Sequence, residues 1–241
     1  MNKMLLALAS YGLAALWGCA SAPPEGADVV ILVHGLGRSP ASMAILGRRL
    51  ESDGFRVVRF GYPSTSEPIE VLVDSLAAEV GRCCGADPGT AHFVTHSMGG
   101  VLVRAYLARQ PQPHGGRVVM LSPPNQGSEI VDAFSESPLL RSFLGPAGTR
   151  LGTDAAGIAS QLPPIRFSVG VIAGDRSLNP LGSWLIPGPD DGKVGVGRTK
   201  LDGAADFIVL SATHTFIMNR ADVAEEVTYF LRQGRFGQTS P

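Results

Sequence analysis

The stretch His92–Gly100, which reads HFVTHSMGG, places an apolar, strand-like run directly before a serine and a helix-like segment. A serine hydroxyl is a weak nucleophile, and a sharp strand-to-helix turn exposes it to a histidine and to backbone N–H groups. Gly99, two residues after Ser97, allows the close backbone approach that such a turn needs. The usual pattern is G-x-S-x-G, and Thr95 replaces its first glycine here. The stretch therefore indicates a nucleophile elbow, and the alternative is a serine that caps a helix after a strand.

A second motif lies upstream, where Val29–Gly37 reads VVILVHGLG. An acyl-transfer site needs two backbone donors for its oxyanion, one after the nucleophile and one in the loop after an earlier strand. Met98 and Leu36 occupy these positions, and a glycine on each side of Leu36 lets its amide turn toward the site. The alternative for this motif is a glycine-rich turn after a buried strand.

One histidine is placed to act as a general base. His214 follows the last strand-like run, precedes the terminal helix, and is the only one of five histidines that comes after every candidate acid. His34 and His96 flank the oxyanion loop and the serine, so we expect them to shape the site. His92 and His114 are assigned to the fold or the surface.

Three aspartates are candidates for the acid that orients this histidine. Asp175 follows the strand-like run 167–174, whereas Asp190 and Asp191 are adjacent in the segment 187–194. The alternative role of Asp175 is that of a turn residue. The alternative role of Asp190 is that of a solvated neighbour of the acid or of a residue that orients it. Position alone leaves the choice among the three open.

Together these segments resemble small bacterial α/β-hydrolases of the lipase/esterase type, at residues 32–37, 94–100 and 191–194 and at His214. Asp191-Gly192-Lys193-Val194 resembles the Asp-x-x-Val setting of the acid in such lipases, which favours Asp191. The resemblance implies a triad of Ser97, His214 and Asp191 that cleaves a small-molecule or lipid ester through an acyl-enzyme, with no cofactor. It also implies that residues 122–128 border the acyl pocket. An acyltransferase or amidase on the same triad, or a catalytically silent surface binding module, is the alternative function.

The hydrophobic pattern predicts about six mostly parallel strands with helices on both faces, and the resemblance implies that they form an α/β-hydrolase fold. The strand-like runs are 28–33, 55–60, 91–96, 117–121, 166–173 and 205–211. Helical patterns lie between them, including one apolar face behind Ser66 and Pro68, one helix from Ser39-Pro40 to Gly54, and one before Gly234.

Composition agrees with one domain over residues 23–241. The chain has 241 residues, 44% of them hydrophobic, and a formal net charge of −1, which argues against nucleic acid as a partner. Residues 188–194 contain a Gly-Lys pair but lack the spacing of a phosphate loop. Cys83 and Cys84 are adjacent and too few for a disulfide framework or a metal site.

The first 22 residues have the form of an export signal and a short linker, with Lys3 before the apolar stretch 4–17. Leu16-Trp17-Gly18-Cys19 resembles a bacterial lipobox, so we expect Cys19 to be lipidated and to attach the protein to a membrane of the cell envelope. Cleavage after Ala22 with release of a secreted enzyme, or an uncleaved anchor, are the alternatives.

The stretch 125–164 is rich in Gly, Ser and Pro, weakly periodic, and placed where a small cap would lie. An irregular helix packed on the sheet edge is the alternative. Residues 134–144 and the 178–186 loop with Trp184 are candidates for lining the acyl site, and surface-packed loop hydrophobes are the alternative.

Overall fold

A single six-stranded sheet organises the protein in a computed structural model, which describes residues 26–84, 90–110 and 115–238. The strands are β1 (Val29–Val33), β2 (Arg56–Phe60), β3 (Ala91–His96), β4 (Arg117–Leu121), β5 (Ser168–Gly174) and β6 (Asp206–Leu210). Their order is β2-β1-β3-β4-β5-β6, and every neighbouring pair is parallel. The predicted fold class is therefore confirmed, and each predicted strand boundary lies within two residues of the observed one.

Both faces of the sheet are buried, which explains why the strands consist mainly of apolar, often β-branched residues. Along β1, Val30 and Leu32 pack into one core, while Val29, Ile31 and Val33 pack into the other. Successive side chains of a strand point to opposite faces, so each short apolar run contributes to two cores at once.

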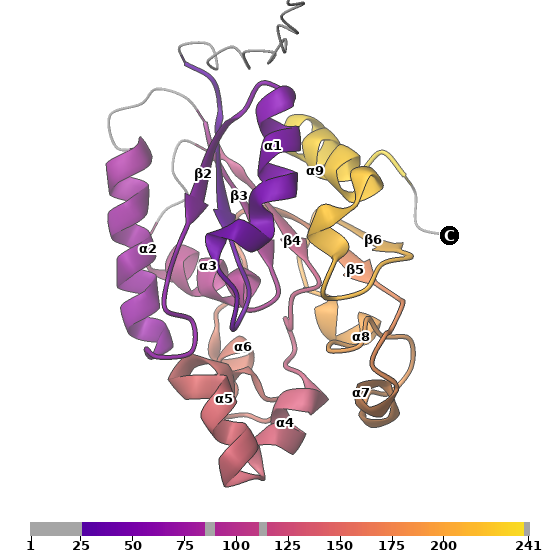
Figure 1. Ribbon diagram of the computed structural model, residues 1–241. Helices are drawn as coiled ribbons and strands as arrows, with labels where there is room; N and C mark the ends of the chain where they lie inside the picture. The colour runs from indigo at the N-terminus through magenta and orange to yellow at the C-terminus, as the bar shows by residue number, and fades with distance from the viewer. Residues whose placement is uncertain (1–25, 85–89, 111–114, 239–241) are drawn as a thin grey trace, which may run out of the picture.

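Two helices cover each face of the sheet (Figure 1). One face carries α1 (Ala44–Ser52), which continues a 3₁₀ turn at Pro40–Met43, and α9 (Ala221–Gln233). The other face carries α2 (Ile69–Cys84) and α3 (Met98–Arg109). The predicted helix ends are confirmed, because Gly54 and Gly234 follow their helices with φ of 92° and 74°, a backbone conformation that glycine adopts without strain.

Two long excursions leave the carboxyl edge of the sheet. The β4–β5 excursion (residues 122–167) contains α4 (Glu129–Ser135), α5 (Pro138–Gly148), a 3₁₀ turn at Thr149–Leu151 and α6 (Ile158–Gln161). The β5–β6 excursion (residues 175–205) contains α7 (Pro180–Leu185) and α8 (Val196–Thr199). In Figure 1, α4, α5 and α7 lie below the sheet, beyond the ends of its strands.

The first excursion is more helical than its weak periodicity indicates. Gly145 has a φ of 65° and Pro146 follows it, so the apolar repeat of α5 is broken inside the helix. A kinked helix of this kind buries its residues in two short pieces rather than along one regular stripe.

Residues 1–25 lie outside the described part of the chain, and so do the predicted signal segment and Cys19. None of the described helices is both long enough and apolar enough to cross a bilayer. Cys83 and Cys84 lie at the end of α2 with their sulfur atoms 2.7 Å apart and no disulfide between them, and the described residues contain no cluster of His, Cys, Asp or Glu suited to a metal ion.

Candidate active site

Ser97 occupies the turn between β3 and α3, at the carboxyl edge of the sheet. Its φ and ψ are 53° and −125°, a conformation that L-residues rarely adopt. The Ser97 amide donates a hydrogen bond of 2.9 Å to the Leu121 carbonyl at the end of β4, which helps to hold the turn. Such strain persists only where the surrounding structure enforces it, and it is typical of functional positions.

The backbone after the serine passes very close to β1. A Cβ atom on Gly99 would lie 2.5 Å from the Val33 carbonyl oxygen and 2.7 Å from that of His34, so only glycine fits without moving backbone. The predicted close approach at this glycine is confirmed. Thr95, which replaces the first glycine of the usual motif, is fully buried, and its hydroxyl lies beside Gly100, where the missing side chain leaves room for it.

His214 lies in the loop after β6 and contacts the serine. Its Nε2 atom is 3.0 Å from Ser97 Oγ, and its Nδ1 atom is 2.8 Å from Asp191 Oδ2. An ionised carboxylate only accepts hydrogen bonds, so Nδ1 carries the proton and Nε2 is free to accept one from the serine hydroxyl. The His214 amide also donates to the Asp191 carbonyl at 2.9 Å, which joins the two loops through their backbones.

Asp191 is held by its own loop. The amides of Lys193 and Val194 donate to its Oδ1 atom at 3.0 and 2.9 Å, which gives the Asp-x-x-Val spacing a structural reason. Burial alone would raise the pKa of this carboxyl, but the charge and hydrogen bond of His214 outweigh it and hold the pKa below its ordinary value. The side chain is therefore an anion at neutral pH.

The other two candidate acids lie elsewhere. Asp190 Oδ1 accepts hydrogen bonds from Ser183 Oγ at 2.8 Å and the Gly192 amide at 2.7 Å, so it ties α7 to the acid loop. Asp175 is exposed and lies 3.8 Å from the Nε atom of Arg176. Of the three aspartates, the structure brings only Asp191 to His214.

The two predicted oxyanion donors flank the serine. Met98 is the first residue of α3, where an amide has no acceptor within the helix. Leu36 lies in a turn beside the serine, since a Cβ atom on neighbouring Gly35 would be 3.0 Å from Ser97 Cβ. Within the described part of the chain, neither amide donates a hydrogen bond to another group. Both donors are therefore available to a ligand oxygen.

His96 and His34 support this edge, as the sequence indicates. The Nε2 atom of His96 is 2.9 Å from the His214 carbonyl oxygen, so it donates there and fixes the loop that carries the base. Burial lowers the pKa of His96 well below its ordinary value, with a further contribution from the charge of His214, and the ring is neutral. His34 stacks on Tyr62, with ring centroids 4.2 Å apart, and its carbonyl accepts the Tyr62 hydroxyl.

Of the two histidines assigned to the fold or surface, His92 lies at the other end of the molecule. It is buried in β3, and its Nδ1 atom accepts a 2.9 Å hydrogen bond from the Arg117 amide. His114 lies outside the described residues.

A cavity of about 140 Å³ adjoins His214, and its lining includes Leu178, Lys193 and Phe216. Of the predicted acyl-lining residues, Leu178 reaches this cavity, whereas Trp184 is 84% exposed and projects into solvent. A larger cavity of about 580 Å³ lies between α3 and the chain before β5. No residue of the serine site lines it, so it is separate from this chemistry.

Sequence reasoning missed the contacts that hold the two excursions together. Asn125 Nδ2 donates to the Thr199 carbonyl at 2.9 Å, and buried Arg104 donates to Asn125 Oδ1 at 3.2 Å. Ser122, at the end of β4, has a φ of 47°, which is the other positive φ of a non-glycine residue in the described chain. No local pattern marks these residues, because their partners lie far away in the sequence.

The chain belongs to the alpha/beta hydrolase family, whose family model matches residues 30–226. Among solved structures, it is similar to the lipase BlEst2 of Bacillus licheniformis. The mature form has a TM-score of 0.72 at 18% identity over 89% of this chain and 94% of that one. The propeptide form has a TM-score of 0.75 at 18% identity over 92% of this chain, which spans only 54% of that protein.

A third similar structure is the phospholipase PlaB of Legionella pneumophila in complex with thio-NAD. It has a TM-score of 0.66 at 19% identity over 85% of this chain and 57% of that one. No curated protein sequence matches the chain. Identities this low show a shared fold, and the chemistry has to be argued from the site itself.

Proposed function

We propose that the protein is a serine hydrolase that cleaves carboxylic esters of small molecules or lipids. The observation that carries the proposal is the row Asp191–His214–Ser97, joined by contacts of 2.8 and 3.0 Å. The row lies beside two backbone amides without acceptors in the described chain. Nucleophile, base and orienting acid in this geometry are the parts that acyl transfer requires.

In the first half of the reaction, Ser97 Oγ attacks the ester carbonyl carbon while His214 Nε2 takes the hydroxyl proton. The carbonyl oxygen becomes an oxyanion and receives hydrogen bonds from the Leu36 and Met98 amides, each worth about 3 kcal/mol in comparable sites. His214 then protonates the leaving alcohol as the carbon–oxygen bond breaks, and Asp191 stabilises the transient imidazolium. The products are an alcohol and an acyl group on Ser97.

In the second half, water takes the place of the alcohol. His214 accepts a proton from the water as its oxygen attacks the acyl carbon, and returns that proton to Ser97 Oγ when the carboxylic acid leaves. The chemistry balances with ester and water alone, so the proposal requires no metal or organic cofactor. Nucleic acid is not expected as a partner, given the net charge of −1.

The test is hydrolysis of p-nitrophenyl esters from acetate to long acyl chains by a chain that begins at Ala20. Ser97→Ala should lower kcat by about 10⁶-fold, because the nucleophile itself is lost. The matched control is Ser75→Ala on α2, whose hydroxyl is exposed and bonds only to its own helix at 2.9 Å. Labelling of Ser97 by a fluorophosphonate, read by peptide mass spectrometry, would place the reaction on this residue.

Unchanged hydrolysis in Ser97→Ala would overturn the proposal. Absence of turnover on every chain length would transfer support to an amidase, an acyltransferase or a silent binding module, because all three are compatible with the fold.

We also propose that the protein is exported and held at the cell envelope by a lipid on Cys19. The support is the lipobox-like segment Leu16–Cys19. Cys19→Ala should move the protein from the membrane pellet to the soluble fraction and remove the mass of the lipid from the N-terminal peptide. A mature N-terminus at Pro23 would contradict lipidation and support ordinary cleavage after Ala22.

A further inference from the structure

The cavity of about 580 Å³ between α3 and the chain before β5 is lined by basic residues but by no acidic one. Its charged residues are Arg104 and Arg109 on α3 and Arg166 just before β5. In the whole chain, 20 basic residues are balanced by 21 acidic ones, so a lining with three positive charges and no negative charge is a local feature. A concave site lined by one sign of charge attracts ligands of the opposite sign.

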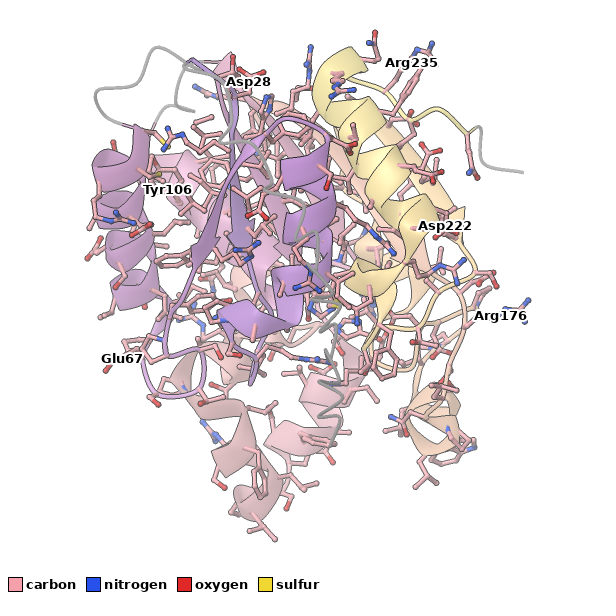
Figure 2. All side chains as sticks on the ribbon, turned by 45° about the horizontal axis from the view of Figure 1, so that its top comes forward. Asp28, Glu67, Tyr106, Arg176, Asp222 and Arg235 are labelled. Atoms are coloured by element: carbon pink, nitrogen blue, oxygen red, sulfur yellow. The ribbon has the colours of Figure 1, made fainter. Side chains whose placement is uncertain are left out.

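The cavity lies on the face of the sheet that α2 and α3 cover. Figure 2 shows Tyr106, which lies on α3 between Arg104 and Arg109, on the opposite side of the molecule from Asp222 of α9. Apart from the arginines the wall is mainly apolar, and three half-buried residues join it to the core of this face: Leu107, Ile165 and Phe167. A mainly apolar wall with a few polar groups is typical of sites for small organic ligands, and so is a volume of this size.

Arg104 is buried without a carboxylate partner. The residue is 6% exposed; its Nη1 atom donates to the Asn125 carbonyl at 3.1 Å and to Asn125 Oδ1 at 3.2 Å, and its Nη2 atom donates to the Ala159 carbonyl at 3.4 Å. All three acceptors are neutral, and the buried Nε atom has no partner in the described chain. Burial lowers the pKa of Arg104 to about 10, so the guanidinium keeps its charge at neutral pH. A buried charge without a counter-ion destabilises the fold, and an anion in the cavity would offset that cost.

The other two arginines lie on the exposed side of the cavity and have little to hold them elsewhere. Within the described part of the chain, the Arg166 guanidinium forms neither a hydrogen bond nor an ion pair. Arg109 Nη1 lies 3.7 Å from Asp74 Oδ1, but these side chains are 51% and 80% exposed, so solvent weakens the pair. A guanidinium presents a planar fork of donors that matches two oxygens of a carboxylate or a phosphate.

We propose that this cavity binds an organic oxyanion, a carboxylate or a phosphate carried on a short apolar body. Arg109 and Arg166 bind the head group within the field of buried Arg104, and the apolar wall covers the body. An inorganic ion would leave the apolar wall uncovered, and a neutral apolar molecule would leave the three charges unpaired, so the site requires both parts of the ligand. No residue of the serine site lines the cavity, and the proposal is independent of the proposed function.

The first test compares compounds that share an octyl chain and differ in the head group: octanoate, octyl phosphate, octan-1-ol and octylammonium. Isothermal titration calorimetry uses a chain that begins at Ala20, which keeps every described residue. At least one of the two anions should bind at one site with a Kd about tenfold or more below that of octan-1-ol, and octylammonium should show no saturable binding. The tighter anion identifies the preferred head group. Its affinity should fall as sodium chloride is raised from about 0.05 to 0.5 M, because salt screens the arginine charges.

The second test removes one positive charge at a time. Arg166→Gln should raise the Kd of the tighter anion about fivefold or more, because a charge-assisted hydrogen bond is lost, and should leave hydrolysis of p-nitrophenyl butyrate unchanged. The matched control is Arg48→Gln on α1, which removes one equally exposed charge from the opposite face of the sheet and should bind like the parent chain.

A third variant addresses the buried charge itself. Arg104→Met should abolish measurable binding of the tighter anion, with urea unfolding as a check that the protein still folds. Asn125→Ala is its control, because it removes two of the same hydrogen bonds in part but keeps the guanidinium charge, and it should bind within about twofold of the parent chain. Weak folding of Arg104→Met leaves the result of Arg166→Gln as the deciding one.

Equal affinities of all four compounds would overturn the proposal, and so would equal losses in Arg166→Gln and Arg48→Gln. A diazirine analogue of the tighter anion should label peptides from residues 104–110 or 163–167, and labelling confined to residues 191–216 would overturn the proposal by placing the ligand at the serine site. Anion binding without hydrolysis of any ester would sustain this cavity as a site and count against the proposed function. Hydrolysis without anion binding would do the reverse.

Discussion

The turn that holds Ser97 and the loop that holds Asp191 position their residues in different ways. Ser97 directly follows β3, and backbone packed at close range on β1 and β4 fixes its geometry. Asp191 lies far beyond the end of β5, in an irregular excursion whose order comes from side chain to backbone hydrogen bonds. The nucleophile is placed by the packing of the sheet, whereas the acid is placed by a polar network.

This difference predicts that substitutions in the serine turn and in the acid loop will have different effects. Packing at the elbow leaves no room for an added atom, so even one methyl group should disturb it. The acid loop is held by several hydrogen bonds of modest energy, so a single loss should weaken it without abolishing its shape.

The largest expected effect is on kcat, and it distinguishes Asp191 from Asp175 as the acid of the triad. Asp191→Asn should lower kcat by about 10⁴-fold with the fold intact, because the amide no longer holds the histidine in the productive tautomer. Asp175→Asn should leave kcat nearly unchanged, since that carboxylate is exposed and paired with Arg176. Steady-state kinetics on a soluble ester, with circular dichroism as a check of folding, measures both. A large loss in Asp175→Asn alone would show that the acid has been misassigned.

The next effect concerns packing at the elbow. Gly99→Ala should lower the free energy of unfolding by about 3 kcal/mol, because the new Cβ would lie 2.5 Å from a backbone oxygen of β1. Gly81→Ala is the matched control: it lies within α2, has no atom within 4 Å of the new Cβ, and should stabilise by about 0.5–1 kcal/mol. Urea unfolding of the three proteins gives both numbers. Equal stability of Gly99→Ala and the parent chain would contradict the close approach.

A smaller effect is expected where the two excursions meet. Asn125→Ala removes the hydrogen bond to Thr199 and one acceptor of buried Arg104, at a cost of about 2 kcal/mol in the free energy of unfolding. Gln126→Ala is the control: its side-chain hydrogen bond to the Lys200 carbonyl joins the same two excursions but is exposed to solvent, so a change within about 0.5 kcal/mol is expected. If both variants unfolded at the same urea concentration, the link between the excursions would be of little energetic importance.

The regular part of the fold could be predicted because each strand is a short apolar run buried on both faces. Such runs begin and end where the burial does, and the observed strands therefore start and finish within two residues of the expectation. Ser97 and His214 follow from the same logic, since both stand just beyond the carboxyl end of a strand. The roles of residues that the sheet positions can therefore be predicted from local sequence.

The roles of residues on the two excursions are harder to predict from local sequence. Asp190 and Asp191 are adjacent and chemically identical, and their roles differ only because His214 arrives from 23 residues further along. The kink at Gly145 hides the helix α5 from a periodicity argument. The exposure of Trp184 depends on the polar anchoring of α7 and is not encoded in the apolar character of the loop itself.

The smallest expected effect is on the pH dependence of stability, and it concerns the neutral ring of His96, which contacts the loop of His214. His96 is buried, and burial lowers its pKa below the ordinary histidine value of 6.5. At a pH below 6.5 the His96 ring therefore binds a proton in the unfolded chain but stays neutral in the folded chain. Stability contributed in this way is complete above that pH and is lost as the pH falls below it. His96→Gln keeps an N–H donor for the His214 carbonyl but cannot titrate.

The free energy of unfolding of His96→Gln should therefore depend less steeply on pH between about pH 6.5 and 5, by up to about 1.4 kcal/mol per pH unit. Buried His34 and His92, whose pKa values burial also lowers, remain in both proteins and supply the residual slope. An unchanged slope in urea titrations across this range would mean that His96 takes up its proton within the fold.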